Sequence, residues 1–437
     1  MILGENMALL LVCFVVFLFM GMPVAFVIGI AGFAFFLSQP MLPFETAVQM
    51  VVLQSQSFAF LAVPFFIFAG NLMNVSGITD QLLSLARLLT RRMYGGTAQI
   101  SVVMSTLMGG VSCSATADAA METRILAPEM MRRGYTKGYI CAVNCLTALI
   151  TATIPPSLGL IIFGFVGEVS IGRLFAAGII PGILMMVFLM ATTTITSRIR
   201  KFDPPAVDSP KLTAREVFEN LKVSVWALLF PIILIVGIRF GLFTPSESGA
   251  FAVIYALVVG KFVYKKLTWQ NFKEALVTTI KDNGAIMLII AMSGPFSYAI
   301  TWVKLPAALS SLIFGITDNQ QILALLMLGF LFVSGMFVDS NVNFLLLTPI
   351  FLPMITKAGM DPVHFGVLMA TIVTLGVMTP PIGSALYTVC GIIDCPPEEY
   401  TKESLPFFIA IILELAILVF CPKLVLFIPN MIFGAAG

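Results

Sequence analysis

The chain has 437 residues, of which 59% are hydrophobic and only 11% are charged. Soluble domains carry roughly 25% charged residues, so this chain cannot hide its apolar surface from water and its solvent must be lipid. The formal net charge of +2 at pH 7 gives no sign of nucleic-acid binding. The sequence therefore predicts an all-α polytopic protein of the lipid bilayer.

Apolar runs that cross a bilayer need about 20 residues. In chain order, the predicted membrane segments are 7–20, 23–37, 49–73, 138–169, 177–198, 223–240, 246–263, 284–303, 363–393 and 405–428. The first two are short and form either one kinked helix or two tilted spans. The segments 138–169 and 363–393 are each broken at a Pro-Pro pair.

Residues 97–133 and 320–357 differ from these spans. Each is a pair of apolar arms of roughly 15 residues that meet at a polar, Gly-containing tip, and arms of that length are too short to cross a bilayer. We expect both to be re-entrant hairpins. Residues 80–93 and 268–281 have the pattern of amphipathic helices that lie along the membrane interface.

Lys and Arg residues are concentrated in two stretches, 198–222 and 261–281, which two predicted spans separate. Because cytoplasmic loops are enriched in Lys and Arg, we expect both stretches in the cytoplasm. Basic residues also flank the first hairpin, so it is predicted to open to the cytoplasm and the second hairpin to the opposite side. The N-terminus is then predicted to lie outside.

A shift of 225 residues superposes the Gly and Pro residues of the two halves. Gly110 falls on Gly335, and the Pro-Pro pair at 155–156 falls on the pair at 380–381. These residue types fix backbone geometry, so matching them means matching breaks and turns. An odd number of predicted spans separates equivalent points, which inverts the second copy.

The sequence thus predicts two inverted repeats, 1–200 and 223–437, joined by a cytoplasmic linker at 201–222. A capping-box pattern at Thr213 and Glu216 starts a helix at the end of this linker. Inverted repeats with broken helices are typical of secondary transporters, whose sites lie at the repeat interface. A purely structural duplication is the alternative.

Polar side chains gather at the two hairpin tips and the two Pro-Pro breaks. A Pro-Pro pair frees backbone carbonyls, which cost several kcal/mol each if they stay unpaired in hydrocarbon. A dehydrated Na⁺ ringed by carbonyl and hydroxyl oxygens would satisfy them. The side chains at hand are Ser112, Ser114, Thr116, Thr151, Thr153, Ser340, Asn341, Asn343 and Thr379. Isolated Ser and Thr residues usually just pack helices together, but clusters at equivalent places favour a site.

The acidic residues of the hairpins raise further hypotheses. Asp339, at a hairpin tip deep in the membrane, is predicted to neutralise a cation or carry a proton. Asp118 and Glu122, one helical turn apart, are either a proton relay or solvated groups, and Arg124 is a possible partner for both. We interpret His364 as an interface residue rather than a titrating switch.

The seven cysteines show no metal-site spacing along the chain. Cys141 and Cys145 are one helical turn apart, and we interpret them as small core residues rather than a redox pair. One His and unclustered Cys argue against a membrane-bound enzyme or a subunit of an energy-converting complex. A cation channel needs an open polar pathway, whereas polar residues here cluster at midplane points.

At the paired breaks PPS and TPPIG and at the tip DSNVN, the chain resembles the large membrane subunit of a TRAP transporter, the DctM-type permease, over essentially its whole length. The resemblance implies import of an organic acid across the bacterial inner membrane, driven by an inward Na⁺ gradient. It implies an elevator motion, in which hairpins and broken helices move as one body against outer scaffold helices. It also implies two partners, a small four-helix membrane subunit and an extracytoplasmic substrate-binding protein.

Carried over by this resemblance, Na⁺ sites fall between each hairpin tip and helix break. Their predicted residues are Gly110, Ser112, Ser114, Thr151 and Pro155 in one half, and Gly335, Val338, Ser340, Met378, Thr379 and Pro381 in the other. Half-helix N-termini suit a carboxylate between these sites. The predicted substrate-binding residues are Ser114, Thr116, Ser157, Asp339, Asn341, Asn343, Gly383 and Ser384.

The family includes sialic-acid and C4-dicarboxylate systems, and overall likeness favours the sialic-acid branch. The alternative function is a proton-coupled organic-anion transporter or antiporter that works without a binding protein.

Overall fold

The computed structural model describes residues 2–56, 58–204, 213–315 and 319–434, and every regular element within these ranges is a helix. Six of these helices are long and apolar enough to cross a membrane, or up to eight if each bent helix pair counts as one span. The predicted all-α membrane fold is therefore confirmed. Residues 205–212 of the predicted linker lie outside the described ranges.

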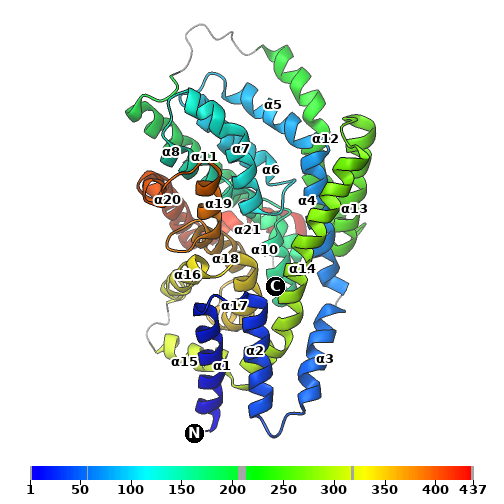
Figure 1. Cartoon of the computed structure of the whole chain (residues 1–437), viewed down its shortest axis with the longest axis vertical. Coiled ribbons are helices and arrows are strands. Elements are labelled where there is room, and N and C mark those ends of the chain that lie inside the picture. Colours follow the sequence, from blue (N-terminus) through cyan, green and yellow to red (C-terminus); the bar gives the residue numbers. More distant parts are fainter. Residues whose placement is uncertain (1, 57, 205–212, 316–318, 435–437) are drawn as a thin grey trace.

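The first half begins with α1 (Ile2–Phe19), α2 (Val24–Ser38) and α3 (Phe44–Ser55) at one end of the elongated molecule (Figure 1). After a 3₁₀ turn at Phe58–Leu61, α4 (Ala62–Val75) and α5 (Ile78–Thr90) lead to the opposite end. A turn separates α1 from α2, so they are two helices rather than one kinked helix. The predicted single span 49–73 is wrong, because the chain leaves the helix after Ser55, whose hydroxyl donates to the Val52 carbonyl.

The first hairpin is formed by α6 (Gly96–Met108) and α7 (Ala115–Arg132). Ser114 ends its tip and caps α7, since its hydroxyl accepts from the Ala117 N–H at 3.3 Å. The predicted broken helix follows as α8 (Lys137–Thr147), α9 (Leu149–Thr153) and α10 (Leu158–Val166), with a 42° bend at the break, and then α11 (Ile171–Arg200).

The second half starts with α12 (Ala214–Arg239). The predicted capping box of Thr213 and Glu216 is present at the N-terminus of this helix. The elements after it are α13 (Pro245–Val258) with a π turn at Val259–Val263, α14 (Trp269–Trp302), α15 (Leu305–Phe314), α16 (Gln320–Phe337), α17 (Ser340–Lys357), α18 (Pro362–Val377), α19 (Ser384–Ile392), α20 (Pro397–Phe420) and α21 (Pro422–Phe433). The second hairpin is α16 with α17, and the second broken helix is α18 with α19. With 18 residues, α16 is one of the six helices long enough to cross a membrane, so the expectation that both arms of this hairpin are too short is wrong for α16.

Two further predictions in this half are wrong. Residues 268–281 are not a separate interface helix, because α14 continues from them through the predicted span 284–303 without a break. The predicted span 405–428 is divided at Cys421, since Pro422 starts α21.

The element order repeats after 225 residues: α7 (Ala115–Arg132) falls on α17 (Ser340–Lys357), and α5 falls on α15. Figure 1 shows α5 at one end of the molecule and α15 at the other, beside the N-terminus. The two basic stretches meet at the α5 end, because Lys266 pairs with Asp80 at 2.6 Å and Arg91 pairs with Glu216 at 3.4 Å.

The helices pack as two groups. α14 packs against α2, α3 and α4, and α13 packs against α4. The hairpins pack against the broken helices, α6 and α7 on α8, and α16 and α17 on α18. We call the first group the outer helices and the second group the inner body.

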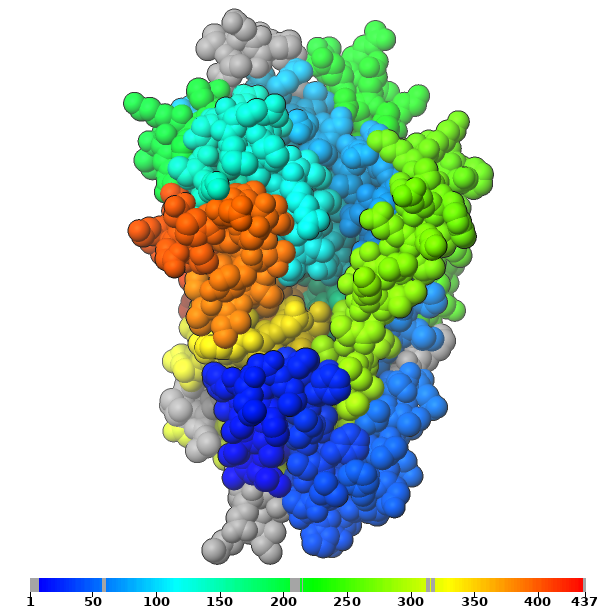
Figure 2. Space-filling view, in the orientation of Figure 1, coloured from blue at the N-terminus to red at the C-terminus, as the bar shows by residue number. Residues whose placement is uncertain are grey.

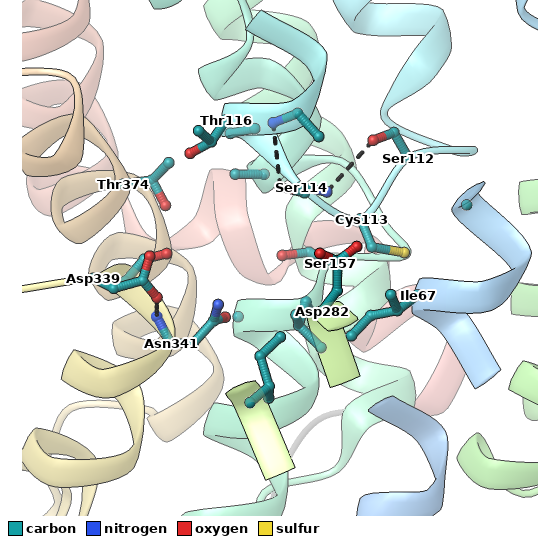
Figure 3. Close-up of a pocket in the computed structure, with 18 of the residues that line it drawn as sticks. Ile67, Ser112, Cys113, Ser114, Thr116, Ser157, Asp282, Asp339, Asn341 and Thr374 are labelled. Atoms are coloured by element: carbon teal, nitrogen blue, oxygen red, sulfur yellow. Dashed lines mark hydrogen bonds between the residues drawn. The ribbon is translucent and has the colours of Figure 1, made fainter. Parts of the chain in front are cut away.

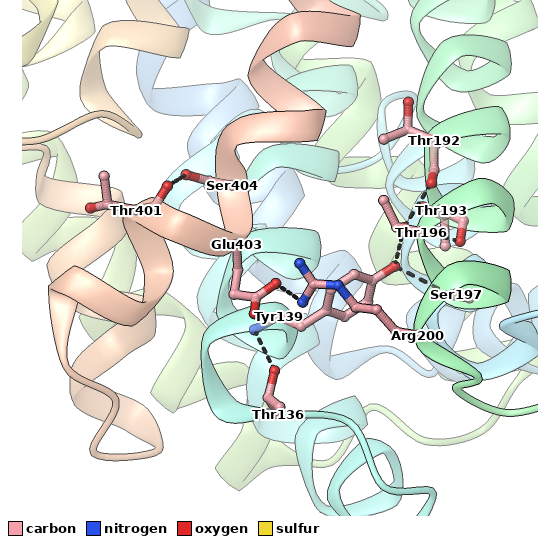
Figure 4. A network of polar contacts seen from close by, with 10 residues as sticks. All are labelled: Thr136, Tyr139, Thr192, Thr193, Thr196, Ser197, Arg200, Thr401, Glu403 and Ser404. Carbon is pink, nitrogen blue, oxygen red and sulfur yellow. Dashed lines mark hydrogen bonds and ion pairs between the residues drawn. The ribbon is translucent and has the colours of Figure 1, made fainter.

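A polar network ties the inner body to α11 and α20 (Figure 4). The Tyr139 hydroxyl, near the start of α8, lies 2.8 Å from the Thr196 hydroxyl of α11. Arg200, at the end of α11, pairs with Glu403 of α20 and stacks over the Tyr139 ring at 5.5 Å. The long helices α11 and α20 are thereby joined to the start of the first broken helix.

Asp203, just after α11, fixes the base of the first hairpin. Its carboxylate accepts from the Thr97 N–H at 2.9 Å and the Thr97 hydroxyl at 2.7 Å, and it pairs with Arg133 at 2.9 Å. Asp203 is 8% and Thr97 3% exposed, so the two Thr97 donors lose a buried acceptor if this carboxylate is removed, whereas the Arg133 side chain is 53% exposed.

We expect Asp203→Ala to lower the free energy of unfolding by about 2 kcal/mol, because it leaves buried donors unpaired. Asp80→Ala is the matched control: Asp80 pairs with Lys266 where both side chains are more than half exposed, and its loss is expected to cost less than about 1 kcal/mol. Thermal unfolding of the purified variants checks the difference. Equal midpoints for the two variants would contradict this role for Asp203.

Candidate functional site

A cavity of about 490 Å³ lies between the inner body and the outer helices. Figure 2 shows the hollow where the first hairpin (cyan), the second hairpin (yellow) and α14 (yellow-green) meet. The polar residues around it are Asn71, Asn74, Ser112, Cys113, Ser114, Thr116, Ser157, Asp282, Asp339, Ser340, Asn341, Thr374 and Thr388. Both hairpin tips, both broken helices, α4 and α14 contribute to this wall.

The first hairpin tip brings three predicted residues, Ser112, Ser114 and Thr116, to the cavity (Figure 3). The tip turns here because the Val111 and Ser112 N–H groups both donate to the Met108 carbonyl at 2.8 Å, which ends α6. The hydroxyls then lie at the N-terminal end of α7.

The second hairpin tip brings Asp339, Ser340 and Asn341 to the same cavity. Asp339 caps α17, since its carboxylate accepts from the Asn341 N–H at 2.9 Å (Figure 3). Asn343 does not line the cavity. Its Nδ2 donates to the Val338 carbonyl at 2.9 Å, and its Oδ1 accepts from the Ser334 hydroxyl at 2.5 Å. Asn343 therefore stabilises the backbone of the tip.

At the first break, Ser157 lines the cavity and α10 begins at the next residue. Both Pro-Pro bonds, 155–156 and 380–381, are cis. At the second break, neither Gly383 nor Ser384 lines the cavity, whereas Thr374 and Thr388 on either side of the break do.

The freed carbonyls at the second break have tyrosine partners that the sequence did not reveal. The Tyr400 hydroxyl donates to the Met378 carbonyl at 2.7 Å, and the Tyr387 hydroxyl donates to the Pro381 carbonyl at 2.9 Å. The Thr379 hydroxyl donates back to the Leu375 carbonyl. A carbonyl oxygen has two lone pairs, so Met378 and Pro381 each keep one acceptor position.

Five further residues predicted for Na⁺ do not line the cavity: Gly110, Thr151 and Pro155 in the first half, and Gly335 and Val338 in the second. The Thr151 hydroxyl joins its break to the hairpin, because it donates to the Ser105 carbonyl at 3.1 Å.

Asp118 and Glu122 on α7 are each only 1% exposed, so the hypothesis that they are solvated is wrong. Glu122 accepts from the hydroxyls of Ser101 at 2.5 Å and Ser105 at 2.9 Å. Both carboxylate oxygens of Asp118 are buried without a hydrogen-bond partner among the described residues, although Ser112 and Thr151 lie beside them. Arg124 is exposed, and within the described ranges no ion pair joins it to either carboxylate.

His364 is 1% exposed, and its Nε2 lies 2.9 Å from the Leu418 carbonyl. This contact joins the start of α18 to the end of α20, and neither residue lines the cavity.

Two glycines allow the tips to pack closely. A Cβ added at Gly335 would lie 2.5 Å from the Val373 carbonyl oxygen and 3.1 Å from the Gly376 Cα, so α16 meets α18 backbone to backbone. A Cβ added at Gly110 would clash with the Pro231 side chain of α12. The first tip therefore packs directly on α12.

Sequence reasoning missed the cavity residues of the outer helices. Asn71 of α4 donates to Thr279 at 3.0 Å and to Asp282 at 3.4 Å, both on α14. The available signal was Asp282 itself, an acidic residue inside a membrane helix, but the division of α14 into two segments concealed it.

The helices α7, α10 and α17 all begin at the cavity wall, so their N–H ends and positive dipole ends face a common space. No Lys or Arg lines the cavity in the described ranges, whereas Asp282 and Asp339 do. The site therefore suits an anionic group held by helix ends, together with a cation that balances the carboxylates.

The sequence matches the family model described as "Tripartite ATP-independent periplasmic transporter, DctM component" over residues 11–424. The chain is 34% identical over 417 residues to the sialic acid TRAP transporter large permease protein SiaM of Vibrio cholerae, covering 95% of this chain and 97% of that protein. It is 31% identical over 406 residues to the 2,3-diketo-L-gulonate TRAP transporter large permease protein YiaN of Escherichia coli, covering 93% and 95%.

Among solved structures, the chain is similar to the YdaH transporter of Alcanivorax borkumensis, with a TM-score of 0.58 and 15% identity over 87% of this chain and 88% of that one. This likeness shows a shared fold.

Proposed function

Because this chain belongs to the DctM family of tripartite ATP-independent periplasmic (TRAP) transporters, as a large permease and not an enzyme, we propose that it imports an organic acid together with Na⁺. The observation that carries the proposal is the cavity where three helix N-termini and two carboxylates meet, between the inner body and the outer helices. The helix ends recognise the acid, and the carboxylates favour a bound cation.

We assign the first Na⁺ site to the space between the first tip and the first break. Asp118 supports this assignment, because a buried carboxylate without a hydrogen-bond partner is costly unless a cation neutralises it. Ser112 and Thr151, beside Asp118, offer the hydroxyl oxygens that a dehydrated Na⁺ requires. Asp118 thus adds a charged ligand to the residues predicted from the sequence.

For Asp118→Asn we expect the Na⁺ concentration for half-maximal uptake to rise about tenfold or more, because the variant keeps the shape and removes the charge. Glu129→Gln is the control, since Glu129 lies on the same helix but pairs with Arg87, away from the cavity. Uptake measured as a function of Na⁺ concentration checks this. An unchanged Na⁺ dependence in Asp118→Asn would remove Asp118 from the site.

For the second site, Asp339 with Ser340 at the tip and the open acceptor positions of Met378 and Pro381 at the break are the proposed ligands. Gly335 and Thr379 shape the backbone around them. The Asp339 carboxylate faces the cavity, so a Na⁺ bound near it also attracts the substrate carboxylate.

The substrate class we propose is a small organic acid of the sialic-acid or C4-dicarboxylate type. The named relatives are described as permeases for sialic acid and for 2,3-diketo-L-gulonate, both of which carry a carboxylate. The cavity of about 490 Å³ has room for such a molecule.

The transport cycle we propose is an elevator, in which the inner body carries the cavity past the outer helices. The halves 1–200 and 223–437 act as inverted repeats. The basic α5 end faces the cytoplasm of a bacterium, and the N-terminus lies outside. The word "tripartite" in the family description fits two partners, a small membrane subunit beside the outer helices and an extracytoplasmic binding protein that delivers the substrate.

Reconstitution into proteoliposomes with both partners tests this function. We expect uptake from a panel of organic acids under an inward Na⁺ gradient, and loss of uptake when Na⁺ is replaced by K⁺ or when either partner is left out. Uptake driven by a pH gradient alone, without Na⁺, would contradict the coupling and favour the proton-coupled alternative.

A further inference from the structure

Three cysteines that are far apart in the sequence converge inside the inner body. Cys141 of α8, Cys390 of α19 and Cys395 of the turn before α20 have Sγ atoms that all lie within 4.8 Å of one another. All three side chains are buried. The spacing along the chain gave no sign of this cluster, because Cys141 belongs to the first half and the other two belong to the second.

The local fold explains how the sulfurs meet. α19 ends at Ile392, and Asp394 adopts a φ of +49°, which turns the chain back. The Cys395 N–H then donates to the Cys390 carbonyl at 3.0 Å, so the two residues lie on the same turn. Cys141 faces this turn from α8, with its Sγ at 3.8 Å from the Val389 carbonyl.

The arrangement fits one thiophilic metal ion. With metal–sulfur bonds of about 2.3 Å, three sulfurs around one ion lie about 4 Å apart, which agrees with the observed upper bound of 4.8 Å. Thiolates select soft ions such as Cu⁺ and Zn²⁺. Packing as small apolar residues accounts for the burial of each cysteine, as it does for Cys145 on the same helix, but it does not require three sulfurs to share one point.

An ion can reach the cluster from the surface. The loop above it is exposed at Gly391 and Asp394, and the exposed carboxylates of Glu398 and Glu399 follow at the start of α20. These acidic groups attract cations to the loop. The proposed orientation puts this end of the molecule in the cytoplasm, where thiols stay reduced and available as ligands.

We propose that Cys141, Cys390 and Cys395 bind one thiophilic ion, Zn²⁺ or Cu⁺, which ties the end of α19 to α8. The ion would link the second broken helix directly to the first, and this link would not involve either hairpin tip. The site is separate from the Na⁺ and substrate positions, since none of the three cysteines lines the cavity.

The test is an anaerobic titration of the purified, reduced full-length chain with Zn²⁺ and, separately, with Cu⁺, followed by removal of free metal and elemental analysis. We expect one bound ion per chain in the wild type, and affinity at least about a hundredfold weaker in Cys390→Ser. Cys421→Ser, which alters an exposed cysteine outside the cluster, should bind like the wild type. The two titrations distinguish Zn²⁺ from Cu⁺.

A second readout does not depend on whether the variants fold. Bound metal should raise the unfolding temperature of the wild type, and a chelator should reverse the rise. Cd²⁺ added to the wild type should give cadmium–thiolate absorption of three sulfurs per ion. Wild-type protein that retains no metal, or that retains as much metal after all three cysteines are changed to Ser, would overturn the proposal.

Discussion

Gly335→Ala is expected to reduce substrate uptake to below about a tenth of the wild-type rate. The added methyl group would lie 2.5 Å from the Val373 carbonyl oxygen, so α16 and α18 must move apart where the second tip meets the second break. Asp339 follows the end of α16 by two residues and Met378 directly follows α18, so separating these helices spreads the proposed Na⁺ ligands beyond reach of one ion.

The matched control is Gly329→Ala on the same helix. A Cβ at Gly329 meets nothing within 4 Å, and Ala is a better helix former than Gly, so this variant should be as stable and active as the wild type or more so. Initial rates of uptake in proteoliposomes, normalised to inserted protein, check the pair. Equal rates for the two variants would show that the close approach of α16 and α18 is not needed for transport.

Asp339→Asn is expected to lower uptake about a hundredfold or more, because it removes the charge from the cavity wall. Asn is as good a helix cap as Asp, so the variant keeps the hydrogen bond from the Asn341 N–H and the start of α17. Asp339→Ala removes both the charge and the cap, and should also abolish uptake while the protein inserts and folds.

Asp361→Asn provides the comparison for Asp339. Asp361 caps α18 in the same way, accepting from the Val363 N–H at 2.7 Å, but it does not line the cavity. Uptake by Asp361→Asn should match the wild type. Full activity of Asp339→Asn, or an equal loss in both variants, would mean that the charge at the second tip has no role in transport.

The breaks and tips were predictable because their signals are local. Pro-Pro pairs and tip glycines act on the backbone within a few residues, so 154–157 and 378–383 are breaks in the structure as well. The start of α12 was predictable for the same reason, since the Thr213–Glu216 capping box is complete within four residues.

Which face a polar residue presents was harder to predict. Asn341 and Asn343 are two residues apart on α17, so one lines the cavity and the other turns back to the Val338 carbonyl. The sequence did not determine whether Asp118 is buried or solvated. In the structure Asp118 is buried, because α7 packs against α8.

Long-range relations had no local signal at all. The polar stretch at the start of α14 resembled an interface helix because its partner, Asn71, is 208 residues from Thr279 in the chain. Likewise, nothing in the spacing of the cysteines joins Cys141 to Cys390.

The proposed elevator requires the inner body to move past the outer helices with the substrate in the cavity between them. Gly70 of α4 faces the first tip, and a Cβ added there would lie 3.8 Å from the Cys113 backbone nitrogen, which is ordinary contact distance. A cysteine at Gly70 would therefore lie beside the native Cys113, and bridging of the two by oxidation is checked by the loss of free thiols. Gly70→Cys combined with Cys113→Ser is the matched control, since it cannot form this bridge.

The most direct measurement is uptake by reconstituted Gly70→Cys before oxidation, after oxidation and after reduction. The elevator predicts that oxidation abolishes uptake, that reduction restores it, and that the Gly70→Cys/Cys113→Ser control is unaffected by either treatment. Undiminished uptake by protein shown to be fully cross-linked would contradict the claim, because the two walls of the cavity would then have no need to separate.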